Sequence, residues 1–155
     1  MESAVDPAVC IAAERDATLN FIDLLRREQG TLQQIDVSAL APLADEKMQQ
    51  VQRLAQLADG RNRWLATLGH SGDRSGMEHV LHDYPAATGV WNELLQLAEA
   101  AAHLNKINGV LIDQRLRHNQ QALAVLQAAS SRDSDLYGSN GQPQASSGGR
   151  PLGEG

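Results

Sequence analysis

Aromatic residues are scarce in this chain, making up 3% of its 155 residues. With so few large rings, a buried core must be filled mainly by Leu, Ala, Val and Ile, the usual core residues of long paired helices. The length fits one domain with a modest core. This composition favours a helical bundle over a sheet.

Three further scarcities exclude classes of protein. Cys10 is the single cysteine, so no internal disulfide can form, and we interpret it as a small buried residue in a reducing compartment. The formal net charge is -6, and no cluster of Lys or Arg is available to neutralise phosphates, which argues against nucleic acid as a partner. The chain has no apolar run of about 18 residues and no basic N-terminal region before an apolar run, so we expect a cytoplasmic protein without membrane insertion.

Apolar periodicity predicts an all-α fold, an antiparallel bundle of three long helices plus one short helix. The first helix is expected from Pro7, after Asp6 as N-cap, to about Gln34. On this helix the charged residues are expected to turn largely outward: Glu14, Asp16, Asp23, Arg26 and Arg27. Pro42 should open a second helix that runs to about Leu68, followed by a glycine-rich hinge and a short helix from Met77 to Tyr84.

The third long helix is predicted from about Ala86 to Ala129 and carries two apolar seams at alternating spacings of four and three. One seam contains Trp91, Leu95, Ala98, Ala102, Asn105, Gly109, Ile112, Leu116, Asn119, Leu123 and Leu126. The other contains Val90, Leu94, Leu97, Ala101, Leu104, Leu111, Ala122 and Val125. Together they are wider than the stripe of ~100° that an ordinary surface helix needs. Such a helix must face at least two neighbours.

After Ala129 the composition shifts to Ser, Gly, Gln and Pro, which cannot bury enough apolar area to offset the entropy of ordering. The expected domains are therefore a helical bundle over residues 1–129 and a disordered tail over residues 130–155. Within the tail, Leu136-Tyr137 is the only adjacent pair of large apolar residues. It is typical of a short docking motif, although it could also fold back on the bundle.

Several catalytic or metal-binding readings compete with a purely binding role. His79, His82 and Asp83 have near-ligand spacing for a divalent metal, but histidines on a solvated hinge explain the same residues, and no second cluster or nearby cysteine is present to close a site. His103 and Lys106 resemble the His-x-x-Lys core of histidine phosphotransfer domains, except that bulky Ile107 follows the lysine. Serine hydrolases and phosphate-loop enzymes lack their motifs here. We expect no enzyme, no cofactor and no metal.

The asparagines of the third helix need explanation. Asn105 and Asn119 fall on the first seam and Asn108 beside it, where an unpaired buried amide costs about 1–3 kcal/mol. They either fix the register of the bundle or await an incoming helix. Gly109 raises the same question, because a mid-helix glycine costs about 1 kcal/mol relative to alanine and usually means close packing against the backbone.

Three segments resemble the flagellar export chaperone family FlgN. They are Leu-Asn-x-x-Asn-Gly-x-Leu-Ile at 104–112, Asn-Gln-Gln-Ala-Leu-x-Val-Leu at 119–126, and Leu-Tyr-Gly-x-x-Gly-Gln at 136–142. The resemblance implies a cytoplasmic type III export chaperone that binds the C-terminal helices of hook–filament junction proteins, prevents their premature assembly and delivers them to the export gate.

By the same resemblance, the cargo surface lies on the long third helix and the tail docks the loaded chaperone on the cytoplasmic platform of the export gate. The expected cargo-binding residues are Asn105, Asn108, Gly109, Ile112, Leu116, Asn119, Leu123 and Leu126. The expected docking residues are Leu136, Tyr137 and Gly138. The alternative of a structural adaptor, whose wide seam makes a homodimer, stays open beside this reading.

Overall fold

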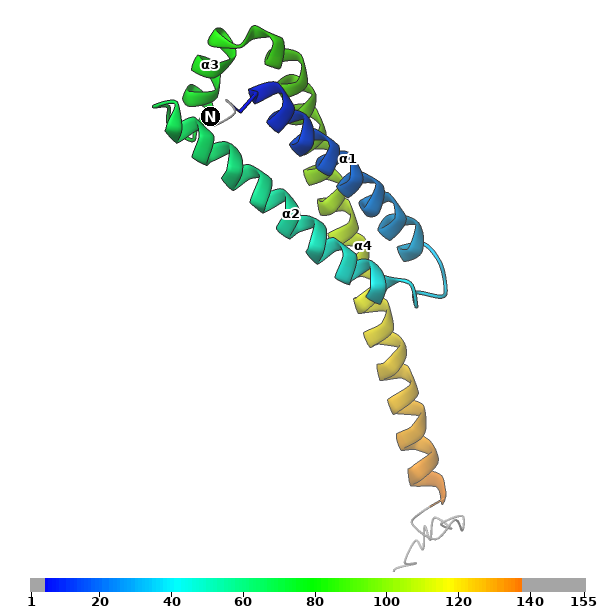
Figure 1. Cartoon of the computed structure of the whole chain (residues 1–155). Helices are drawn as coiled ribbons and strands as arrows, with labels where there is room; N and C mark the ends of the chain where they lie inside the picture. Colours follow the sequence, from blue (N-terminus) through cyan, green and yellow to red (C-terminus); the bar gives the residue numbers. More distant parts are fainter. Residues whose placement is uncertain (1–4, 138–155) are drawn as a thin grey trace, which may run out of the picture. The chain divides into compact units, whose positions relative to one another are not determined.

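The computed structural model describes the backbone of residues 5–137 and the side chains of residues 5–133 (Figure 1). Its elements are α1 (Pro7–Leu32), α2 (Leu40–Thr67), α3 (Arg74–Asp83), the 3-10 helix η1 (Pro85–Ala87) and α4 (Thr88–Tyr137). No strand occurs within residues 5–137, and the three long helices and one short helix confirm the predicted all-α bundle. By its contacts the chain divides into two parts, Met1–Asp113 and Gln114–Gly155, which we describe separately.

The helix ends follow local chemistry. Asp6 caps α1, because its carboxylate accepts the N–H of Ala8 at 2.9 Å and Pro7 occupies the first helical position. The end of α2 is a glycine cap: Gly69 has φ +79°, and the N–H of His70 donates to the carbonyl of Leu65 at 2.9 Å. The glycine that breaks the apolar pattern in the sequence is thus the residue that ends the helix.

Ion pairs fix α1 and α2 in antiparallel register. Glu14 pairs with Arg61 at 2.5 Å, and Glu28 pairs with Lys47 at 3.1 Å. Both glutamates are buried. The prediction that Glu14 turns outward is therefore wrong: Arg61 of α2 reaches it, and a buried carboxylate with a hydrogen-bonded partner is tolerated inside a bundle.

The core of the first part consists of two clusters along the bundle. One joins α1, α2, α3, η1 and α4 through Ile11, Trp64, Leu65, Met77, Val80, Ala87 and Leu94. The other joins α1, α2 and α4 through Phe21, Ile22, Leu24, Leu25, Leu43 and Ala101. In Figure 1, α3 closes the end of this part at which α1 begins and α2 ends.

The helix α4 extends past the end predicted for it. It continues to Tyr137, beyond Ala129. The reason is that residues 130–137 contain neither Pro nor Gly, so propagation needs only one backbone bond per added residue and no buried area. The domain boundary expected after Ala129 stays a prediction, and α4 runs through it without a break.

Candidate functional site

The two apolar seams of α4 differ in exposure over the part of the helix before Gln114. Leu94 and Ala101 of the second seam are 4% and 7% exposed and belong to the core clusters. On the first seam, Leu95 is 48% exposed and Ile112 is 42% exposed. Trp91, which begins the first seam, packs against the core, and we call the rest of that seam in this part the open row: Leu95, Ala98, Ala102, Asn105, Gly109 and Ile112. The bundle uses one seam of α4 and leaves the other available.

Asn108 belongs to the interior of the bundle. It is 0% exposed, and its Nδ2 donates to the carbonyl of Leu25 at 2.8 Å and to Oε1 of Glu28 at 3.0 Å. Glu28 also accepts from Nζ of Lys47 at 3.1 Å. One amide therefore links α4 to α1 and, through Glu28, to α2, which is the register-fixing role and not a surface presented to cargo.

Asn105 and Gly109 lie on the open row. Asn105 is exposed, in contrast to Asn108 one turn along. A Cβ built on Gly109 would meet nothing within 4 Å. The close packing that a mid-helix glycine indicates is thus not supplied by the described part of this chain.

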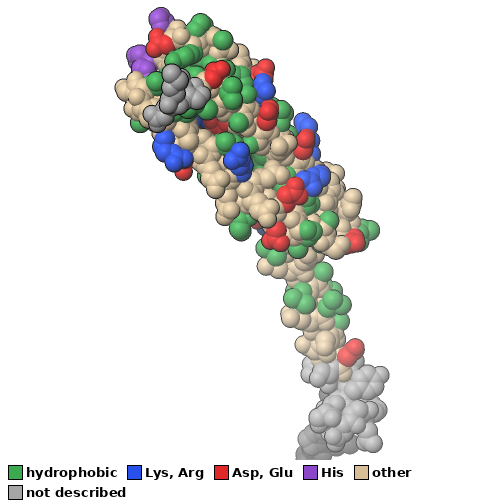
Figure 2. All heavy atoms as spheres, viewed as in Figure 1, with side chains coloured by type: hydrophobic (Ala, Val, Ile, Leu, Met, Phe, Trp, Pro, Cys, Tyr) green, Lys and Arg blue, Asp and Glu red, His purple; other side chains and the backbone are tan. Residues whose placement is uncertain are grey.

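The second part of the chain continues the first seam with larger side chains. Leu116, Leu123 and Leu126 are 54%, 55% and 66% exposed, and Asn119 between them is exposed as well. We call these four residues the distal row. In Figure 2, hydrophobic side chains are visible along this segment, which is coloured yellow to orange in Figure 1. Exposed leucines at helical spacing are typical of an interaction surface.

A groove of about 550 Å³ opens between α2 and α4 in the first part of the chain. Its floor contains the buried residues Phe21, Leu94 and Ala101. Val51, Ala55 and Ala58 of α2 line one wall, and Leu95, Ala98 and Ala102 of the open row line the other. At one end the guanidinium of Arg61 lies 5.1 Å from the ring centroid of Trp91, and Asn105 lies at the other end. The groove is long, mostly apolar and walled by two helices, the geometry that receives a third helix.

The profile of a known family, described as FlgN protein, matches residues 1–145 of this chain. The chain belongs to the FlgN family. A relative from Proteus mirabilis, named Flagella synthesis protein FlgN, is 29% identical over 103 residues, which cover 62% of this chain and 69% of that relative. A protein of the same name from Yersinia enterocolitica is 41% identical over 63 residues, which cover 41% of this chain and 42% of the relative. No solved structure matches the chain.

Part of the FlgN motif at the C-terminal end lies outside the described residues. Leu136 and Tyr137 belong to the last turn of α4, but their side chains are not described, and Gly138 follows the last described residue. Their docking role stays a prediction.

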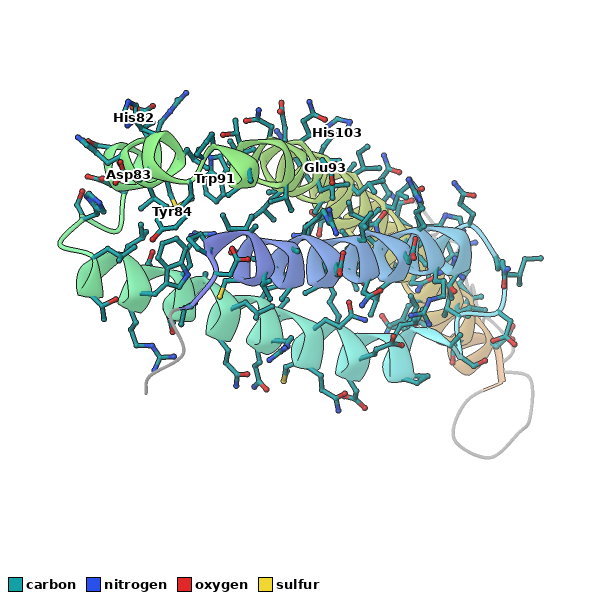
Figure 3. The ribbon with its side chains drawn as sticks, turned by 45° about the horizontal axis from the view of Figure 1, so that its top comes forward. His82, Asp83, Tyr84, Trp91, Glu93 and His103 are labelled. Atoms are coloured by element: carbon teal, nitrogen blue, oxygen red, sulfur yellow. The ribbon has the colours of Figure 1, made fainter. Side chains whose placement is uncertain are left out.

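The histidines of α3, His79 and His82, are exposed surface side chains. His79 stacks on His70 with ring centroids 5.5 Å apart, and its Nδ1 lies 2.7 Å from the carbonyl oxygen of Ser75. Figure 3 shows His82 and Asp83 at the end of α3, where the His82 Nδ1 lies 3.5 Å from Oδ1 of Asp83. Within residues 5–133 no group of three or more His, Cys, Asp or Glu side chains is placed to hold a metal ion.

The other side chains considered in the sequence analysis are His103, Lys106 and Cys10. His103 and Lys106 are both exposed on α4, and His103 points away from α1 (Figure 3). Cys10 is half-buried, and burial, together with nearby Asp6, raises the pKa of its thiol. None of the described helices combines the length and apolar composition that crossing a bilayer requires.

Proposed function

We propose that this chain is a cytoplasmic flagellar type III export chaperone. It holds the C-terminal helices of hook–filament junction proteins, prevents their premature assembly and delivers them to the export gate. Membership of the FlgN family and the name of the relatives, Flagella synthesis protein FlgN, support the flagellar role. The exposed apolar seam of α4 is the single observation that supports helix binding.

The apolar area exposed on α4 suits reversible binding of a cargo helix. The distal row offers three leucines that are more than half exposed, and an amphipathic cargo helix would bury them at about 25 cal/mol per Å² of apolar area. Part of that free energy is offset by the cost of ordering a disordered cargo segment. The net affinity is therefore moderate, as a carrier that must release its cargo requires.

We assign the cargo contacts to residues that the structure leaves accessible on α4. These are Asn105, Gly109, Ile112, Leu116, Asn119, Leu123 and Leu126. Asn108 is left out of the contact set, because its amide is buried against α1 and bonded there. The segment Leu136-Tyr137-Gly138 is proposed to dock the loaded chaperone on the cytoplasmic platform of the gate.

The test is a binding titration of the full chain against the C-terminal peptide of a hook–filament junction protein. Leu123→Asp places a charge on the distal row and should raise Kd about 10- to 100-fold. This is the loss of affinity expected when the burial of one leucine side chain, which contributes about 1.5–3 kcal/mol, is removed. Gln121→Asp is the matched control, since residue 121 is exposed and lies about 200° around the helix from residue 123. Equal Kd values for both variants and the natural chain would contradict the assignment.

The same protein and peptide also distinguish a chaperone from a homodimeric adaptor. A chaperone takes up the peptide into a complex of new mass and added helicity, measured by sedimentation and circular dichroism. A dimer of unchanged stoichiometry, with no added helicity, would support the adaptor instead.

A further inference from the structure

We propose that the groove between α2 and α4 is a receptor for an amphipathic helix with large aliphatic residues along one edge and Lys or Arg beside that edge. The inference rests on the proposed function and deepens it, because it names the chemistry of a cargo helix and a second surface that receives it. The groove lies wholly within Met1–Asp113.

Two apolar stripes with the same period run along this groove and continue beyond its ends. The stripe on α2 consists of Ala44, Met48, Val51, Ala55 and Ala58, at spacings of four and three. Met48 is 65% exposed and Val51 is 48% exposed. The facing stripe on α4 is the open row, which has the same alternation. A period of 3.5 residues on both walls is the pattern that a docked helix meets in a coiled coil.

The size of the wall residues determines the size of the residues that fit between them. Ala55 and Ala58 face Ala98 and Ala102 across the groove. Methyl groups on both sides leave space for Leu, Ile or Met on an incoming helix, which would pack as knobs into these holes. A second copy of the same groove does not fit, because two hollow surfaces cannot fill each other.

The charges on the rims determine which helix is favoured. The rim residues are those that follow each stripe residue, and all of them are exposed: Asp45, Gln49, Gln52, Gln56 and Asp59 on α2, with Gln96, Glu99, His103, Lys106, Val110 and Asp113 on α4. Asp59 and Glu99 flank the groove itself, and Asp45 and Asp113 continue the rims beyond its ends; together with Lys106 they give a formal charge of -3. Within the groove, Glu14 and Arg61 neutralise each other in their ion pair. The rims therefore favour Lys or Arg beside the apolar edge of the partner.

Two synthetic peptides test the proposal directly. Both carry three heptads with Leu and Ile at the a and d positions, and they differ only in Lys or Glu at the e and g positions. Titrated into the full chain and followed by fluorescence anisotropy, the lysine peptide should bind about tenfold more tightly than the glutamate peptide at low salt, and the difference should shrink as salt rises. Equal affinities, or no binding of the lysine peptide, would overturn the proposal.

A groove variant and a matched control locate the binding. Ala98→Arg fills and charges the groove and should weaken the lysine peptide at least about tenfold. Ala100→Arg is the control, because residue 100 is exposed, lies outside the groove and points to another side of α4. Unfolding curves establish that both variants fold. Reversal of the rim in Asp59→Lys with Glu99→Lys should transfer the preference to the glutamate peptide.

The outcomes separate this inference from the proposed function. If Ala98→Arg leaves both peptides and the junction-protein peptide unaffected while Leu123→Asp abolishes cargo binding, the groove is not a receptor and the chaperone role stands. If the groove behaves as expected and no junction-protein peptide binds, the groove stands and the proposed cargo is wrong. If the natural chain sediments as a dimer that Ala98→Arg dissociates, another copy occupies the groove and the inference fails.

Discussion

Asn108 and Asn105 show how two identical side chains three positions apart on one helix take opposite roles. Asn108 is buried and donates to Leu25 and Glu28, whereas Asn105 is exposed at the end of the groove. Burial with defined partners makes the first amide a part of the fold. The second is free of that duty and is available to a partner.

The two asparagines give a matched prediction. Asn108→Ala removes the two buried hydrogen bonds that Asn108 donates to the Leu25 carbonyl and to Glu28, so the free energy of unfolding should fall by about 2 kcal/mol. Asn105→Ala should change it by less than about 0.5 kcal/mol and should weaken cargo binding. Urea unfolding followed by circular dichroism measures the first effect, and peptide titration the second. Equal losses of stability in the two variants would contradict the division of roles.

The burial of two glutamates in α1 could not be predicted from the sequence of that helix. A glutamate is expected to face solvent, yet Glu14 and Glu28 are buried. Their burial depends on basic partners that the packing of α2 against α1 brings close. Arg61 and Lys47 lie on α2, more than a dozen residues from either glutamate, so the periodicity of α1 alone cannot show that they are near. A search for a constant sum of residue numbers would have found both pairs, since 14 with 61 and 28 with 47 give the same sum, as antiparallel helices require.

At the scale of the element, Gly109 tests whether a partner packs against α4. Gly109→Ala should raise the free energy of unfolding by about 1 kcal/mol, because alanine is the better helix former and the new Cβ meets nothing within 4 Å. If a cargo helix approaches the backbone there, the same change should raise the Kd for cargo several-fold.

Gly60→Ala is the control for that experiment. Gly60 lies in α2, and its added Cβ also meets nothing within 4 Å. It should stabilise the chain in the same way without changing cargo affinity. Unchanged cargo binding in Gly109→Ala would remove Gly109 from the contact surface.

The start of α3 predicts a pH dependence. The hydroxyl of Ser71 donates to Asp73 at 2.6 Å and the N–H of Gly76 donates to it at 3.0 Å, and these bonds lower the pKa of the Asp73 carboxyl. A lowered pKa in the folded state means that the cap stabilises the fold above the ordinary aspartate pKa of about 4 and that this stabilisation is lost as the pH falls through the lowered value.

The measurement compares the natural chain with Asp73→Ala across pH. The natural chain should be the more stable at pH about 7, and the gap in urea midpoint should close as the pH falls below about 4. Asp73→Asn keeps an acceptor oxygen but does not titrate, so its offset from Asp73→Ala should stay constant. A gap between the natural chain and Asp73→Ala that does not depend on pH would show that the carboxylate charge is irrelevant to α3.

The elements themselves were largely predictable, because Asp6, Gly69 and Pro85 are strong local signals for where helices begin and end. The end of α4 was not, because low apolar content after Ala129 removes packing but does not itself break a helix. The open row illustrates the same distinction. Its heptad spacing is visible in the sequence, but which of the two seams of α4 faces α1 is decided by tertiary packing. The α2 wall of the groove was not predicted as a surface: Ala44, Val51 and Ala58 recur at heptad spacing in the sequence, but that spacing does not show whether they face the core or a groove.

At the scale of the whole molecule, holding cargo and docking at the gate should be separable. Tyr137→Ala should leave cargo affinity unchanged, because the residue lies more than two helical turns beyond Leu126 along α4, and should lower the amount of cargo exported. Export is measured as secreted junction protein, and affinity by peptide titration. Tyr84→Ala is the matched control, since it removes an exposed tyrosine at the end of α3 and should leave export unchanged. Loss of cargo binding in Tyr137→Ala would assign the segment to cargo instead.

The alanines that line the groove between α2 and α4 bear on how selective this molecule is toward its clients. The alanine methyl groups of the groove's two walls offer no donor and no acceptor, so the walls respond to the breadth of a visiting helix more than to the identity of each side chain. Leu, Ile, Met and Val at the contacting positions are then nearly interchangeable. Cargo helices with dissimilar sequences can therefore share the groove, and the charged residues on its rims discriminate among them by repelling helices of like charge.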